Sequence, residues 1–222
     1  MSNFLRNILL ILSLLLSNNA FSLNSSSYLV VNTAINLFDF DKAKINFEQI
    51  DRDLGESNLH DQLLTYVNLG LLKQGNSIAK KIISINKLNQ EAWIVCLANA
   101  KINNNKDAFD EFELIKDKSE FNLLNYIFFS QNGDIKNKEL IAQSIFEVIQ
   151  ASVNQSNDNI DYKFILFHLS ISTMMDSNFN EAYFYQAQIY NKLKKYSKAE
   201  LYYNKVLITD NLFLESQKNI AF

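Results

Sequence analysis

The sequence predicts an all-α protein built from repeated helix pairs. Proline is absent and only four glycines occur in 222 residues, whereas strands joined by tight turns usually require more of both. Apolar residues make up 48% of the chain, which is enough to bury a substantial core. These apolar residues recur at helical spacing through most of the chain, so helices joined by short polar turns are expected.

Residues 1–22 read as a secretory signal peptide. Arg6 supplies an early positive charge, and an apolar run follows over Ile8–Leu16. This run is too short for a bilayer, which needs about 20 residues, so no stable membrane anchor is expected after processing. Small residues before Leu23 predict cleavage after Ser22. The protein is therefore expected to be exported.

A helical repeat domain is expected over residues 23–222, and it begins with three divergent repeats in 28–118. Asp39 and Asp41 favour a helix N-terminus. A turn is expected at 74–76, where Gly75 fits the left-handed position at a helix C-terminus. The expected helix pairs are 29–37 with 40–50, 59–73 with 77–88, and 90–102 with 107–116, the last pair turning at 103–105.

The stretch 119–177 is less regular. Apolar periodicity predicts helices over 121–130, 138–153 and 160–175, but these segments lack the small alanine that marks the other repeats. We interpret them as irregular helices of the same array. A helical insert, or a small separate bundle, is the competing interpretation.

Residues 180–213 form the clearest repeat, with two helices in 34 residues. Small Ala187 lies four residues after Tyr183 and three before Tyr190, and small Ala199 precedes large residues on the second helix. Small residues let two helices approach closely, while aromatic side chains fill the space between pairs. The order of large, small and large residues therefore predicts tight pairing.

This order resembles the tetratricopeptide repeat (TPR), although Asn211 stands where that family usually has proline. The resemblance implies a right-handed α-solenoid of antiparallel helix pairs. An exported leader before such repeats is similar to uncharacterised exported bacterial TPR proteins, which implies the periplasm or cell envelope. The residues expected to pack the repeats are Ala43, Phe47, Ala79, Ile83, Ala108, Phe112, Tyr183, Ala187, Tyr190, Ala199, Tyr203 and Val206.

The family has no shared catalytic residues, so the resemblance implies a protein-binding adaptor or scaffold. A peptide or partner helix would bind in the concave groove. Aromatic residues at helical spacing also suit a core, and this alternative stays open for Trp93 and Tyr185. The other function considered is a structural module that stabilises a larger polypeptide or a homo-oligomer. The expected groove residues are Trp93, Ile94, Leu97, Lys101, Phe184, Tyr185, Gln188, Asn191 and Lys192.

Several other classes of function find little support in the sequence. The formal charge is −3 and no basic patch occurs, so nucleic acid is not an expected partner. The histidines, His60 and His168, have no partner at metal-ligand spacing, so neither a metal, a cofactor nor catalysis is expected. Cys96 is the single cysteine, and its apolar neighbours predict a buried role.

Residues 214–222 look like the opening helix of an incomplete repeat. Without a cap, Leu212, Leu214 and Ile220 would leave an apolar face uncovered. The chain could be a piece of a longer protein, the short helix could itself be the cap, or the end could be a surface for homo-oligomers.

Sequencing the N-terminus of the exported protein checks the processing site. We expect the mature chain to begin at Leu23, because small side chains precede the peptide bond between Ser22 and Leu23. A mature protein that keeps Met1 would contradict the prediction.

Overall fold

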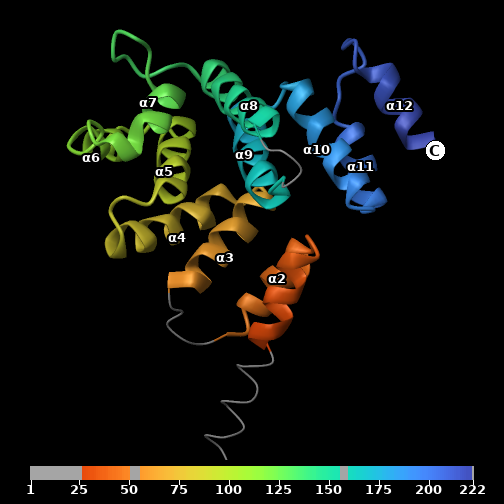
Figure 1. Ribbon diagram of the computed structural model, residues 1–222, viewed down its shortest axis with the longest axis horizontal. Coiled ribbons are helices and arrows are strands. Elements are labelled where there is room, and N and C mark those ends of the chain that lie inside the picture. The colour runs from red at the N-terminus through yellow and green to blue at the C-terminus, as the bar shows by residue number, and fades with distance from the viewer. Residues whose placement is uncertain (1–26, 51–55, 156–159, 222) are drawn as a thin grey trace, which may run out of the picture.

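The structure, a computed structural model, describes residues 27–50, 56–155 and 160–221, and this part of the chain is all-helical (Figure 1). Helices adjacent in sequence pack against each other as pairs. Within these ranges the only strand-like pairing is one antiparallel bridge between Phe129 and Ile135. The all-α prediction is confirmed. The expected signal peptide, 1–22, lies outside the described residues.

The helices follow the chain in a simple order. Residues 27–36 are helical. The elements after them are α2 (Phe40–Phe47), α3 (Glu56–Asn68), α4 (Leu72–Ile85), α5 (Gln90–Ile102), α6 (Asp107–Glu113), the short 3-10 helix η1 (Ser119–Phe121), α7 (Asn122–Phe128), α8 (Lys138–Gln155), α9 (Tyr162–Met175), α10 (Asn180–Lys192), α11 (Tyr196–Tyr203) and α12 (Phe213–Ala221).

Local polar residues set several helix ends where the sequence predicts them. The Asp39 carboxylate caps α2 by accepting a hydrogen bond from the backbone N–H of Lys42 at 3.2 Å. This cap satisfies one of the free N–H groups at a helix start. Asn104 takes a positive φ of 53° in the turn between α5 and α6, a conformation that asparagine tolerates.

The predicted turn at 74–76 is wrong. Gly75 lies inside α4 and is buried, and the turn between α3 and α4 falls at residues 69–71. There Gly70 has a positive φ of 70°, and its N–H donates to the Val67 carbonyl at 2.9 Å. The sequence gives no clear signal for this turn, because the neighbours of Gly70 on both sides are apolar and turns are usually marked by polar residues. Gly75 instead permits close packing, because an added Cβ would lie 3.3 Å from Val67 Cγ2.

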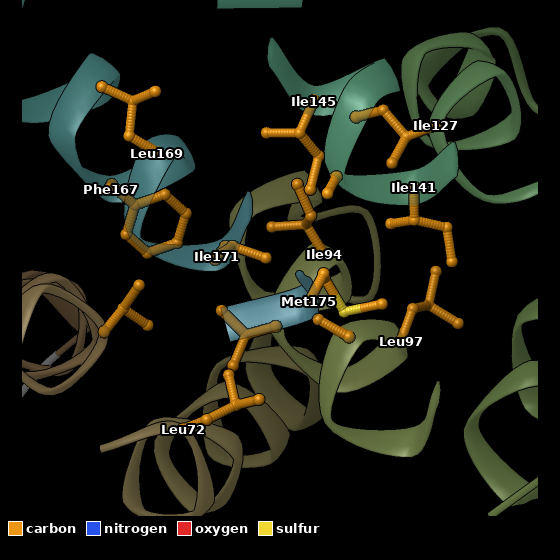
Figure 2. Packing of buried hydrophobic residues seen from close by; sticks show 14 of the residues in the cluster. Leu72, Ile94, Leu97, Ile127, Ile141, Ile145, Phe167, Leu169, Ile171 and Met175 are labelled. Atoms are coloured by element: carbon orange, nitrogen blue, oxygen red, sulfur yellow. The ribbon is translucent and has the colours of Figure 1, made fainter. Parts of the chain in front are cut away.

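The helix α9 lies at the centre of the molecule and contacts α3, α5, α8 and α10 (Figure 1). It is apolar around most of its circumference, which is typical of a helix covered on all sides. Figure 2 shows its Ile171 and Met175 in the part of the core that also holds Ile94 and Leu97 of α5. One core cluster runs from Leu59 to Val206, so the helices of 119–177 share it with the clearer repeats.

The residues expected to pack the repeats lie inside the protein. All of them are buried except Ala108, which is partly buried against the core. Tyr190 and Tyr202 stack with ring centroids 5.3 Å apart at 10°. At the C-terminal end α12 packs on α11, while Leu214 stays 71% exposed.

Substitution of Gly70 tests the corrected turn. Gly70→Ala should lower the free energy of unfolding by about 1 kcal/mol, because a Cβ at positive φ is strained. Gly70→Asn should lower it by less, as Asn104 already adopts such a φ. Urea unfolding followed by circular dichroism measures both, and equal stabilities for the two variants would contradict the assignment.

Candidate functional site

The expected groove residues on α5 are mostly buried. Trp93, Ile94 and Leu97 are each at most 2% exposed. The Trp93 indole N–H donates to the Lys87 carbonyl at 2.8 Å, and its ring packs on Phe112 at 5.3 Å between centroids. These three side chains are therefore mainly core residues.

The expected groove residues on α10 divide between core and surface. Phe184 is buried and its ring packs on Tyr203, with centroids 5.6 Å apart. Tyr185 is partly buried against Phe146. The remaining members, Lys101 and Gln188, are partly exposed, and Asn191 and Lys192 are exposed. The expected set therefore does not line one concave wall.

A different groove lies where helices from the N-terminal and C-terminal halves of the chain meet. It encloses about 300 Å³ between α2, the end of α3, α9, α10 and α11. Its lining combines apolar, hydroxyl, amide and ammonium groups. The lining residues are Asp41, Asn68, Leu69, Gly70, Ser170, Thr173, Met174, Tyr183, Tyr190, Lys198, Leu201, Tyr202 and Lys205.

Lys198 joins the two sides of this groove. Its ammonium lies 3.6 Å from the Asp41 carboxylate of α2 and donates to the Phe38 carbonyl at 3.4 Å. The same ammonium lies over the rings of Phe40 and Tyr190, 5.6 and 5.7 Å from their centroids. Because Lys198 belongs to α11, one side chain connects the N-terminal helix pair to the C-terminal one.

Three tyrosines, Tyr183, Tyr190 and Tyr202, form the aromatic wall of the groove. Burial, the larger cause, together with the nearby Tyr183 and Asp41, raises the pKa of Tyr202 to about 12. Burial likewise raises the pKa of Tyr183 and of Tyr190. Their phenols therefore stay protonated near neutral pH and can donate hydrogen bonds to a ligand.

A buried row of polar side chains underlies the groove. The Gln186 amide N–H donates to Ser170 Oγ at 3.2 Å, and the Ser170 hydroxyl lies 3.5 Å from Asn68 Oδ1. The Asn68 amide donates to the Leu64 carbonyl at 2.8 Å. Within the described part of the chain Gln186 Oε1 has no hydrogen-bond partner. Since burying polar groups is costly unless they are paired, this row fixes how α3, α9 and α10 meet.

The two histidines and the cysteine lie away from this groove. His168 is buried and its Nδ1 lies 2.8 Å from the Phe164 carbonyl oxygen. Burial raises the pKa of the Cys96 thiol to about 12, which keeps it protonated. His60 Nδ1 lies 3.4 Å from a carboxylate oxygen of Glu91 on α5.

Among the residues that the structure describes, no three His, Cys, Asp or Glu side chains gather as metal ligands. In the same ranges no helix has the length and hydropathy to cross a bilayer. The chain matches no protein-family model. Searches of curated proteins and of solved structures likewise found no match. The geometry of the groove is therefore the basis for any functional conclusion.

Sequence reasoning missed the groove because it assigned Tyr183 and Tyr190 only to packing between the repeats. A usable signal was present. Lys198, Leu201, Tyr202 and Lys205 are spaced as i, i+3, i+4 and i+7, the spacing of one helix face. The sequence does not predict the contact between Lys198 and Asp41, because Asp41 is distant in the sequence.

The buried His168 predicts a loss of stability in acid. Burial lowers its pKa from 6.5 to about 4 in the folded protein. As pH falls, the unfolded chain therefore takes up the proton first. The contribution of neutral His168 to the free energy of unfolding is therefore fully present above about pH 6.5. It is lost as pH falls towards 4, and the total loss is about 3 kcal/mol.

Urea unfolding between pH 7 and 4 measures this loss. His168→Gln should reduce the pH dependence, because glutamine does not titrate. His60→Gln, at a partly exposed position, is the control and should retain it. If the free energy of unfolding of His168→Gln changed with pH as steeply as that of the wild-type protein, the assignment would be contradicted.

Proposed function

We propose that the protein is a non-catalytic adaptor that binds an extended peptide segment of a partner protein in the groove between α2, α9, α10 and α11. The observation that carries this proposal is the mixed lining of that groove. Apolar contact area beside a few directed polar groups is what peptide and ligand sites usually present.

The dimensions favour an extended segment over a helix. A helix with its side chains is about 10–12 Å across, whereas the groove encloses only about 300 Å³. That volume accommodates a few side chains. Leu201, which is 56% exposed, offers apolar contact at the groove, and the exposed Lys205 offers a polar group beside it.

The proposed architecture is a right-handed α-solenoid of antiparallel, TPR-like helix pairs. The packing of adjacent helix pairs and the burial of small alanines between large residues support it. We also propose export to the periplasm or cell envelope, with a protein of that compartment as partner. This part rests on the N-terminal sequence alone.

A structural role is the second candidate, and specific observations favour it. Trp93 and Phe184 are buried, so these two side chains are not exposed for binding. Near the C-terminal end Leu207, Ile208 and Leu214 are 44%, 77% and 71% exposed. Such side chains suit an interface with a further domain or a second copy.

Selection from a phage library of random dodecapeptides tests the adaptor function. Peptides that bind the purified protein should bind about tenfold more weakly to Leu201→Lys, because a charge would replace apolar contact area in the groove. Leu114→Lys is the matched control. Leu114 is 85% exposed on the C-terminal side of α6 and does not line the groove.

Fluorescence anisotropy of the selected peptides gives the affinities, and light scattering of the same samples gives the oligomeric state. Peptides that bind both variants equally, or a library that yields no binder, would overturn the adaptor function. A stable oligomer in that case would favour the structural role.

A further inference from the structure

The groove contains two lysines in similar aromatic settings but with different partners. Lys198 Nζ lies over Phe40 and Tyr190 and has the Asp41 carboxylate beside it. Lys205 Nζ lies over Tyr183 and Tyr202, 5.2 and 5.0 Å from the ring centroids. Within the described ranges no carboxylate lies at ion-pair distance from Lys205.

Two tyrosine rings lie next to Lys205. The rings of Tyr183 and Tyr202, which flank its ammonium, are 6.5 Å apart between centroids and inclined at 32°. The phenols remain neutral near pH 7, so the position near the Lys205 ammonium offers one cation and neutral donors. This combination suits an anion with several acceptor positions.

The charge balance favours a singly charged anion. Lys198 offsets Asp41, which leaves Lys205 as the unpaired charge of the lining. Burial first, and the nearby Asp176 carboxylate second, raise the pKa of Tyr183, so a dianion would meet additional repulsion from Asp176. The arginines of the chain, Arg6 and Arg52, lie outside the described residues, and the groove shows no guanidinium fork of the kind that suits phosphate.

We infer that the groove selects peptides with an acidic side chain, whose carboxylate binds the Lys205 ammonium and the Tyr183 and Tyr202 hydroxyls. This inference rests on the proposed peptide-binding function and names the determinant of its specificity. Leu201 and Met174 lie in the same lining, so apolar residues are expected beside the acidic one. A bound peptide would cover Lys205 and so strengthen its charge interaction relative to the exposed state.

The experiment measures the coupling between Lys205 and the acidic residue of a dodecapeptide selected on the wild-type protein. Replacing that Glu by Gln, or Asp by Asn, should weaken binding to the wild-type protein about fivefold. The same replacement should have no effect on Lys205→Gln. Lys73→Gln, at an exposed lysine of α4 outside the groove lining, is the matched control and should behave as wild type.

Salt dependence provides a second measurement. Raising NaCl from about 50 to 500 mM should weaken the binding of the acidic peptide to the wild-type protein and to Lys73→Gln, because salt screens exposed charges. It should have little effect on Lys205→Gln. Circular dichroism confirms that each variant keeps its helices.

The outcomes separate the inference from the proposed function. Peptides that are sensitive to Leu201→Lys but have no common acidic residue would overturn the inference and leave the adaptor function standing. The inference would also be overturned, with the adaptor function left standing, if replacing the acidic residue of the peptide weakened its binding to Lys205→Gln as much as its binding to the wild-type protein. Failure to obtain any peptide sensitive to Leu201→Lys would overturn both.

Discussion

The burial of α9 is the constraint on which the rest of the structure depends. A helix that is apolar around most of its circumference must be covered on several sides, because each exposed aliphatic side chain would lose about 1.5–3 kcal/mol of transfer free energy. Here α3, α5, α8 and α10 supply that cover. In a one-dimensional stack each repeat contacts only its neighbours. The contacts of α9 with α3 and α5 go beyond such a stack and gather helices that are distant in sequence around α9 (Figure 1).

The groove follows from this arrangement. With α3 and α10 both packed on α9, α11 comes close to α2, and Lys198 of α11 reaches Asp41 and Phe38. Near the groove α9 carries Ser170 and Thr173 in place of aliphatic residues. This polar strip gives the groove a hydrogen-bonding floor on a helix that is mostly apolar. The site is thus a product of the central packing and belongs to no single repeat.

Much of the fold could be predicted from local information. The bounds of α5 agree with the prediction, because Asn89 caps its start and an asparagine turn ends it. The turn at Gly70 was missed, since its neighbours are apolar, and Gly75 was the more conspicuous glycine. The site was harder to predict than the fold. Helical spacing cannot distinguish an aromatic residue in a core from one in a groove, and Trp93 proved to be in the core. The contact between Lys198 and Asp41 depends on tertiary packing, which local patterns do not encode.

The contacts across the groove also bear on how the protein folds. Ser170 meets Asn68 across 102 positions of the chain, and Lys198 meets Phe38 across 160. Closing such long loops is entropically unfavourable until many contacts form together, so topologies of this kind fold more slowly than local helix pairs. An emerging chain can pair its early helices, but it cannot assemble the groove before α11 has been synthesised. The groove therefore exists only in a chain that extends at least through α11, and shorter nascent chains lack it.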